Sequence, residues 1–309
     1  MRTRSLLRLK TFILIGGFWA GSGLLMAQTA PPATSTPAAQ PAAKKKATAK
    51  AKAEAPPALT LEPKAIEILK AVGSRLALAH TISFTAVETF ESLSRQGVPL
   101  VYANRSLVTL ERPNKLRIIQ TGDGPASEFY YDGKIMMAYA PVENLVAIAD
   151  APGTIDDTLE TIFHTAGIYF PFTDIIVADP YGDMAPGLLH AYYVGQSNVV
   201  GGTTTDIVAC AADGVFMELW IGVEDKLPRA IHAIYLDDPD QLRHNLLLSD
   251  WQIDSPVSAE VFTTTKAAGA RHMQFAHPHP EPPPGARPPA GRTAPAKTNP
   301  TNPAAKPQQ

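Results

Sequence analysis

Residues 128–140 read Glu-Phe-Tyr-Tyr-Asp-Gly-Lys-Ile-Met-Met-Ala-Tyr-Ala, and this stretch decides the fold class. Aromatic and apolar residues, which favour strands, stand on both sides of Asp132-Gly133. Asp-Gly is typical of the tight turn of a β-hairpin, because both central residues tolerate a positive φ. The pattern predicts two antiparallel strands, Glu128–Tyr131 and Lys134–Ala140, joined by a two-residue turn.

Alternation of apolar and polar residues continues on both sides of this hairpin. Short links rich in Gly, Asp and Pro separate the alternating stretches, and short links join antiparallel strands. Further strands are expected at Ser83–Phe90, Val98–Leu110, Lys115–Gln120, Asn144–Ala149, Ala191–Val199, Thr203–Ala211, Val215–Gly222, Arg229–Leu236 and Asn245–Ile253, with a last short strand at Phe262–Thr265.

Two stretches follow the helical period instead. A helix is expected to begin at Glu62-Pro63, where proline fits the first turn. A second begins after Thr154, a good N-cap, and short helical pieces follow at Phe172–Ala178 and Tyr181–Leu189. We therefore expect an α+β fold: a curved antiparallel sheet of about 11 strands, an unclosed β-barrel, with the N-terminal helix and a mid-chain helical insert covering its concave face.

Composition divides the chain into one domain and two flanks. Of the 29 prolines, 17 lie in residues 28–58 and 277–309, which contain almost no large apolar residues. Such segments bury too little surface to offset their chain entropy. We expect a disordered Pro/Ala/Lys-rich arm at 28–58, a β-rich domain at 59–276 and a disordered Pro-rich tail at 277–309.

The N-terminus resembles an export signal. Arg2, Arg4, Arg8 and Lys10 precede the largely apolar stretch Phe12–Ala27. This order predicts a signal peptide at residues 1–27, with cleavage after Ala27, and a periplasmic protein. The alternative is an uncleaved signal that anchors the chain in the inner membrane.

Charge narrows the partners. Residues 59–276 hold 14 Lys and Arg against 27 Asp and Glu, a net charge of −13. An acidic domain repels phosphate backbones, so we expect no nucleic-acid partner. The lysines of the arm (Lys44, Lys45, Lys46, Lys50 and Lys52) are a solvated linker or a weak contact with an anionic membrane surface.

The sequence carries no signature of catalysis. It lacks a Gly-x-Ser-x-Gly elbow, a phosphate loop, a dinucleotide fingerprint, a His-Glu-x-x-His motif and a Cys-x-x-Cys pair. The single cysteine, Cys210, stands in an apolar run and is expected to be buried. We expect no catalytic residue, no cofactor and no metal site, although His272, His277 and His279 form a weak histidine group.

Two acidic clusters have ordinary explanations. Asp156-Asp157 suits the first turn of the second helix, where the helix dipole favours negative charge. Asp237-Asp238-Pro239-Asp240 lacks the spacing of an EF-hand and is expected to be a hairpin turn.

Alternating apolar side chains supply the candidate site. If the sheet curls without closing, the side chains on its concave face line an apolar cavity. If the helices fill the space over that face, the same side chains form an ordinary core. The candidates on strands are Phe84, Tyr102, Ile135, Met137, Tyr139, Met217, Leu219, Ile234 and Trp251. The candidate lid is the insert helix, with Leu159, Ile162 and Phe163.

Six phrases, in order along residues 61–275, together resemble a bacterial family of predicted periplasmic proteins, domain of unknown function 2092. The resemblance implies a fold like the lipoprotein carriers LolA and LolB, and the family offers no catalytic residues to transfer. The phrases are Leu61-Glu-Pro-Lys-Ala-Ile-Glu-Ile-Leu-Lys70, Phe129-Tyr-Tyr-Asp-Gly-Lys134, Ala151-Pro-Gly-Thr-Ile-Asp156, Asp179-Pro-Tyr181, Leu227-Pro-Arg229 and Leu248-Ser-Asp-Trp251.

Three functions follow as hypotheses. The leading one is a non-enzymatic periplasmic protein that binds a lipid, a lipoprotein acyl chain or another apolar ligand. The alternative is a module that contacts or senses another envelope protein, and the third is an uncharacterised hydrolase.

Overall fold

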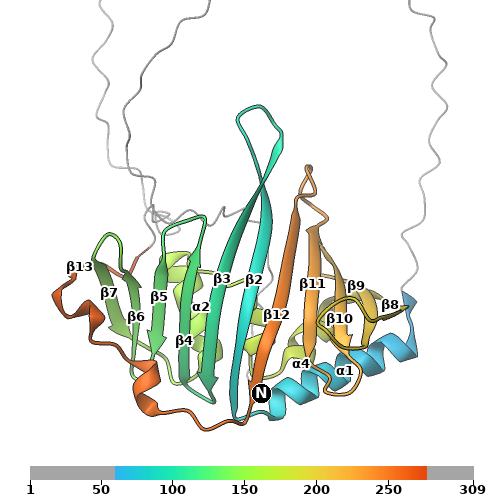
Figure 1. Ribbon diagram of the computed structural model, residues 1–309, viewed down its shortest axis with the longest axis horizontal. Helices are drawn as coiled ribbons and strands as arrows, with labels where there is room; N and C mark the ends of the chain where they lie inside the picture. Colours follow the sequence, from blue (N-terminus) through green and yellow to red (C-terminus); the bar gives the residue numbers. More distant parts are fainter. Residues whose placement is uncertain (1–59, 277–309) are drawn as a thin grey trace, which may run out of the picture.

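A single large sheet forms the body of the molecule. The computed structural model describes residues 60–276. The expected signal, arm and tail, with His277 and His279, lie outside the described residues. Thirteen strands form one sheet in the order β1-β8-β9-β10-β11-β12-β2-β3-β4-β5-β6-β7-β13 (Figure 1).

Eleven of the twelve expected strands are present, and two short parallel edge strands add to them. The added strands are β1, which pairs with β8, and β13, which pairs with β7. The strands are β1 (Thr60–Leu61), β2 (Thr81–Leu93), β3 (Pro99–Glu111), β4 (Lys115–Gly122), β5 (Ser127–Tyr131), β6 (Ile135–Ala140), β7 (Leu145–Asp150), β8 (Leu188–Ser197), β9 (Thr205–Ala212), β10 (Val215–Gly222), β11 (Pro228–Tyr235), β12 (Arg243–Ile253) and β13 (Arg271–Met273).

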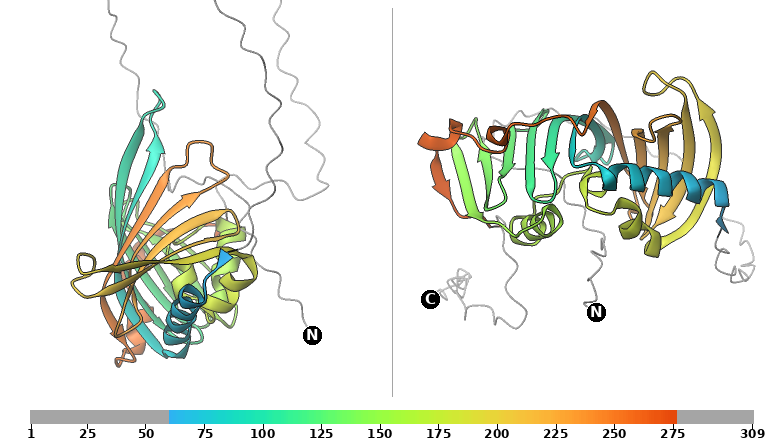
Figure 2. Two further views of the ribbon diagram at one scale, coloured as in Figure 1. Left: turned by 90° about the vertical axis from the view of Figure 1, so that its right-hand side faces the viewer. Right: turned by 90° about the horizontal axis from the view of Figure 1, so that it is seen from below.

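The sheet is curved, and the helices lie against its concave face. Figure 2 shows α1 (Pro63–Leu78) crossing beneath the strands at one end and α2 (Ile155–Ala166) beneath those at the other. Between them lie α3 (Thr173–Ile176), α4 (Pro180–Met184) and the 3-10 turn η1 (Ala185–Gly187). The α+β fold class, with an unclosed sheet and helices over its concave face, is confirmed.

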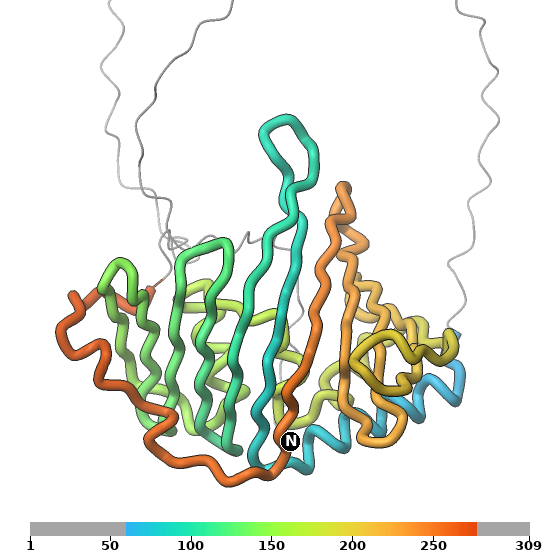
Figure 3. The backbone as a smooth tube through the Cα atoms, viewed as in Figure 1, coloured from blue at the N-terminus to red at the C-terminus, as the bar shows by residue number. Residues whose placement is uncertain are grey.

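Strand register carries one row of core side chains across the sheet. Phe84 on β2 pairs with Val108 on β3, and Val108 pairs with Ile118 on β4. Ile118 pairs with Phe129 on β5, which pairs with Ala138 on β6. The first four side chains are at most 4% exposed, so this row marks the concave, core-facing set of side chains. Figure 3 traces the backbones of the neighbouring strands that carry it.

The helical insert is held at its start and at its middle. At its start, the Thr154 side chain accepts a hydrogen bond from Asp157 N, as expected for an N-cap. At the end of α3, Arg112 donates to the carbonyl oxygens of Ile176 (3.1 Å) and Val177 (2.8 Å) and, at 3.4 Å, to that of Leu76. One guanidinium thus ties α3 and the end of α1 to the turn after β3.

Two local expectations are corrected. The β5–β6 turn lies one residue later than expected: Tyr131 pairs with Met136 and Asp132 N donates to Ile135 O, so Gly133 and Lys134 form the turn. The Asp132 carboxylate accepts from both Lys134 N and Ile135 N. The expected strand at Phe262–Thr265 is absent: η2 (Ala259–Phe262) and η3 (Lys266–Gly269) are 3-10 turns that precede β13. Within residues 60–276, the helices are all too short or too polar to cross a bilayer.

Candidate functional site

Four predicted cavity residues come together on the concave face. Phe84 stacks on Trp251, with ring centroids 4.6 Å apart, and meets Phe172 of the insert edge-on at 5.6 Å. Leu219 is buried in the same cluster, and Met217 packs against it. These side chains form a packed core between sheet and insert; a ligand role for them stays a prediction.

Two of the three lid residues, Leu159 and Ile162, belong to the same core. Leu159 is 7% exposed and Ile162 is fully buried. Phe163 is partly buried and contacts His164, with ring centroids 5.3 Å apart. The α2 helix therefore covers the sheet as expected, and any opening motion stays a prediction.

The predicted residues of β6 lie on the other face of the sheet. Met136 pairs with Tyr131 in the main core, so Ile135, Met137 and Tyr139 point to the convex side. There Met137 and Tyr139 pack against a small cluster that contains Ala267 and Ala270 of the C-terminal segment. The face assigned to these three residues is corrected: both alternating sets of β6 are apolar, so periodicity does not tell which set faces the core.

Ile234 also lies on the convex side. It pairs with Phe216, whereas Met217 pairs with Ala233. The main core is contacted by Met217 and Leu219 of β10 and by Ile231 of β11. Ile234 stands three residues after Ile231 on β11, so it points to the opposite face. Ile234 therefore does not join Phe84 and Trp251.

Tyr102, the remaining candidate, leads to a group that sequence analysis did not assemble. Its ring stacks on Phe90 at 5.7 Å, and Phe90 stacks on His244 at 6.3 Å. His244 meets Tyr235 edge-on at 5.1 Å. The Tyr169 hydroxyl, from the loop between α2 and α3, donates a hydrogen bond to that of Tyr235. We call these five residues the aromatic row; it crosses β3, β2, β12 and β11.

Two carboxylates stand beside the aromatic row. Glu88 precedes Phe90 by two residues, so both point to the concave face, and Asn104 donates to the Glu88 carboxylate at 3.4 Å. Burial raises the pKa of Glu88, which the Asn104 hydrogen bond partly offsets. Asp174 on α3 is exposed, yet crowding by the surrounding chain raises its pKa through desolvation, and the nearby Asp183 adds to it. The row and the two carboxylates form the concave-face site.

Electrostatics links the parts of this site. Desolvation by the surrounding chain raises the pKa of Tyr169 well above its usual range, and Asp174, Tyr235 and Glu88 add to the shift. Burial and Asp174 likewise raise the pKa of Tyr235. Tyr169 is nevertheless 43% exposed. On a concave surface, a side chain has many neighbours and can still be open to solvent. Tyr169 is such a side chain, so a ligand can reach this end of the row.

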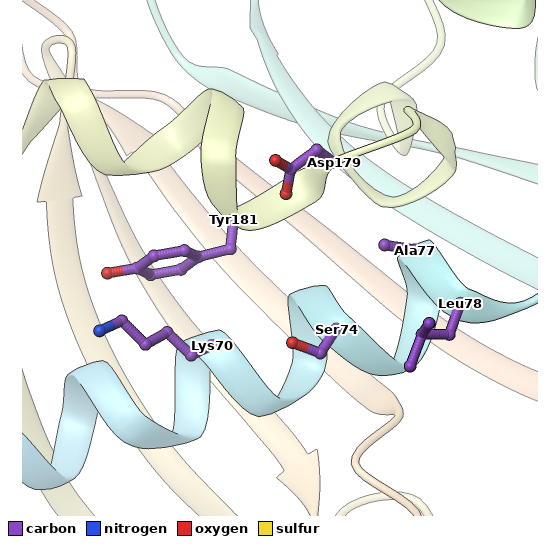
Figure 4. A pocket seen from close by; sticks show the side chains of 6 residues that line it. All are labelled: Lys70, Ser74, Ala77, Leu78, Asp179 and Tyr181. Atoms are coloured by element: carbon purple, nitrogen blue, oxygen red, sulfur yellow. The ribbon is translucent and has the colours of Figure 1, made fainter.

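A second hollow lies between α1 and α4 (Figure 4). Its volume is about 390 Å³, and its lining consists of Lys70, Ser74, Ala77, Leu78, Asp179 and Tyr181. The Lys70 ammonium stands 5.7 Å from the centre of the Tyr181 ring. The Asp179 carboxylate caps α4 by accepting from Gly182 N at 3.0 Å. The two charged groups of this hollow thus already have partners within the fold.

Neither metal binding nor thiol chemistry finds a site in the part of the chain that the structure describes. No three His, Cys, Asp or Glu side chains within residues 60–276 gather as metal ligands do. Burial raises the pKa of Cys210 to about 12, so the thiol stays protonated at neutral pH. Asp238 closes its turn by accepting from Asp240 N and Leu242 N, both at 3.1 Å.

Fold and site together describe an unclosed antiparallel sheet with helices against its concave face and an aromatic row beside the covered core. A family model described as "Predicted periplasmic protein (DUF2092)" matches residues 65–276. The chain belongs to this family and is a periplasmic protein. No curated protein matches the sequence.

Solved structures of similar fold come from several bacteria. MucB in the Pseudomonas aeruginosa MucA/MucB complex is 15% identical, with 66% of this chain and 62% of that chain covered and a TM-score of 0.38. LprF from Mycobacterium bovis is 17% identical over 65% of this chain and 97% of its own, at 0.39. The LolA superfamily protein NE2245 from Nitrosomonas europaea is 11% identical, with 65% of this chain and 97% of that chain covered and a TM-score of 0.29. The match covers about three fifths of the MucB chain.

Proposed function

We propose that this protein binds, without catalysis, a molecule with an apolar part on the concave face of its sheet. The observation that supports this is the aromatic row. Five rings from four strands and one loop line up where they remain partly exposed. Soluble proteins seldom leave such a contiguous aromatic surface unused, and it is suited to an alkyl chain or a ring.

The row stands next to the covered core. Along the same face of β2, Phe84 lies under the insert and Phe90 lies in the row. A ligand on the row therefore borders apolar side chains that the insert covers. In this proposal the insert is the lid, and its displacement would extend the apolar surface from Phe90 toward Phe84 and Trp251.

Binding can be measured with the uncharged fluorescent probe N-phenyl-1-naphthylamine. We expect saturable binding by the wild type and a loss of at least tenfold in affinity for Tyr102→Ala. Tyr192→Ala is the matched control, since both tyrosines are 38% exposed and Tyr192 pairs with Ala209 on the convex face. Equal affinities for the two variants, or no binding by the wild type, would overturn the proposal.

The native ligand can be sought in the same preparation. Organic extraction of the protein purified from the periplasm, followed by mass spectrometry, should yield a molecule with an alkyl chain or an apolar ring. The Tyr102→Ala protein should yield less of it. Clean extracts from the wild type, together with no probe binding, would favour the second candidate.

That second candidate is contact with an envelope protein through the β2–β3 hairpin. This hairpin extends beyond the rest of the sheet (Figure 1), and its end carries exposed Leu93, Val98, Leu100 and Val101. A photo-crosslinker at Val98 should give one defined product in cells, whereas one at Val142, an exposed valine in the β6–β7 turn, should not. A ladder of products at both positions would contradict it.

A further inference from the structure

We propose that the concave-face site selects ligands that carry a positively charged nitrogen, such as an amine or a quaternary ammonium group, beside their apolar part. This inference rests on the proposed function, because it names the chemistry of the ligand that the aromatic row receives. The titration described below distinguishes a failure of this inference from a failure of the proposed function.

Two carboxylates without a cationic partner support this choice. Neither Glu88 nor Asp174 takes part in the ion pairs Lys115–Glu111, Arg229–Asp225 and Lys266–Glu128 of the described residues. The hydrogen bond that Glu88 receives comes from the neutral amide of Asn104. Both carboxylates are thus left with negative charge that a ligand can neutralise.

The row itself adds no competing cation. His244 is its only basic side chain, and burial lowers the pKa of His244, although Asp238 and Glu91 partly offset this. The imidazole is therefore neutral at neutral pH. A neutral ring contributes stacking surface and repels no positive charge.

Aromatic faces and carboxylates together are the two groups that hold organic cations. A cation within about 6 Å of a ring centre is attracted by the negative face of the ring. Phe90 is stacked by both Tyr102 and His244, so Tyr102 and Tyr235, the rings beyond these two contacts, are the ones that would offer a face to a cation near Glu88. The net charge of −13 over residues 59–276 also draws cations toward the domain.

Isothermal titration of the protein purified in its exported form can test this with four probes used below micelle formation. They are decyltrimethylammonium, decanoate, decyl maltoside and tetramethylammonium, so that chain and charge vary independently. We expect decyltrimethylammonium to bind at least tenfold more tightly than decanoate or decyl maltoside. The same probes separate a lipid-like source, which needs the chain, from a small free amine, which does not.

Each outcome has a distinct meaning. Equal binding of the three decyl probes would overturn the inference and leave the proposed function standing. Binding of tetramethylammonium as tight as that of decyltrimethylammonium would show that the charge alone is recognised, and it would overturn the apolar part of the ligand in both the inference and the proposed function. No binding of any probe would overturn both.

Substitution of the carboxylates sharpens the test. The double variant Glu88→Gln, Asp174→Asn should lose at least tenfold in affinity for decyltrimethylammonium and less than twofold for decyl maltoside. Glu91→Gln is the control, because Glu91 stands on the same strand with the opposite parity and accepts from Arg243 N. Unchanged cation binding by the double variant, with an unchanged far-ultraviolet circular dichroism spectrum, would overturn the inference.

Discussion

Phe84 and Phe90 lie on the same face of the same strand, six residues apart, and have different surroundings. Phe84 is 3% exposed and lies between Trp251 of β12 and Phe172 of the insert. Phe90 is only partly buried, between Tyr102 and His244 of the neighbouring strands. The difference is the cover, because the insert supplies a ring against Phe84 and the ring partners of Phe90 all come from the sheet.

This comparison shows that one alternating strand can supply core at one end and a binding surface at the other. A period of two fixes which side chains share a face. What covers that face depends on where the insert ends, which no residue of β2 encodes. The predictions below test whether the two ends differ as the structure indicates.

The largest expected effect is on stability at Phe84. Phe84→Ala should lower the free energy of unfolding by about 3–5 kcal/mol, because it leaves a cavity in a packed core. Phe90→Ala should cost about 1 kcal/mol, since its partly exposed ring has less packing to lose. Urea denaturation of both variants measures this, and equal losses would contradict a covered and an uncovered end.

Phe90→Ala should also weaken binding of N-phenyl-1-naphthylamine at least tenfold, while Phe84→Ala, measured well below its unfolding midpoint, should retain binding. The opposite result would place the ligand in the core beneath the insert. That would restore the cavity first expected around Phe84, Met217 and Trp251.

The next effect compares the two faces of β6. Met136→Ala should cost about 2–4 kcal/mol, because Met136 is 3% exposed in the main core. Met137→Ala should cost about 1 kcal/mol, because Met137 only borders the small cluster under the C-terminal segment. Thermal or urea unfolding would reveal the reverse order if the strand had the parity that the sequence suggested.

A smaller effect concerns the fixing of the insert. Arg112→Met should destabilise by about 2 kcal/mol, because carbonyl oxygens of Leu76, Ile176 and Val177 lose a charged donor. Amide hydrogens of α3 should exchange faster than those of the sheet. The control Arg105→Met, at an exposed position on β3, should change neither the stability nor the amide exchange. If the amides of α3 still exchanged slowly in Arg112→Met, other contacts would hold the insert.

The sequence predicted elements well and the site poorly, for physical reasons. Asp132-Gly133, Thr154 and Glu62-Pro63 act locally, so the hairpin and two helix starts were predictable. The aromatic row joins residues distant along the chain, and stacking between Phe90 and His244 depends on the register of β2 with β12.

Tyr102 was found because its strand is long and regular. Tyr169, in a loop, carried no periodic signal. Phe90 stands six residues after Phe84 in the expected strand Ser83–Phe90, and this even spacing was the one clue that the face continues beyond the core. The partners that make it a site come from β3, β12, β11 and the insert, and no single stretch of sequence contains them.

The smallest expected effect is a dependence of stability on pH at the carboxylates of the concave-face site. The pKa values of Glu88 and Asp174 are raised in the folded state, chiefly by desolvation. Between the unfolded and the folded pKa, the folded state binds more protons, so stability falls as pH rises through this window. At a pH below the unfolded pKa of a group, that group is protonated in both the folded and the unfolded state, so it no longer lowers the stability of the wild type.

Glu88→Gln and Asp174→Asn should therefore each be as stable as the wild type, or slightly more stable, at pH 7. The advantage should shrink as pH falls toward about 4, where the carboxyl groups of the unfolded chain become protonated as well. Glu91→Gln, for comparison, should show no such gain. Unfolding curves measured from pH 4 to pH 8 test this. A variant that is less stable than the wild type at pH 7 would mean that the carboxylate already has a stabilising partner, which would also remove its attraction for a cationic ligand.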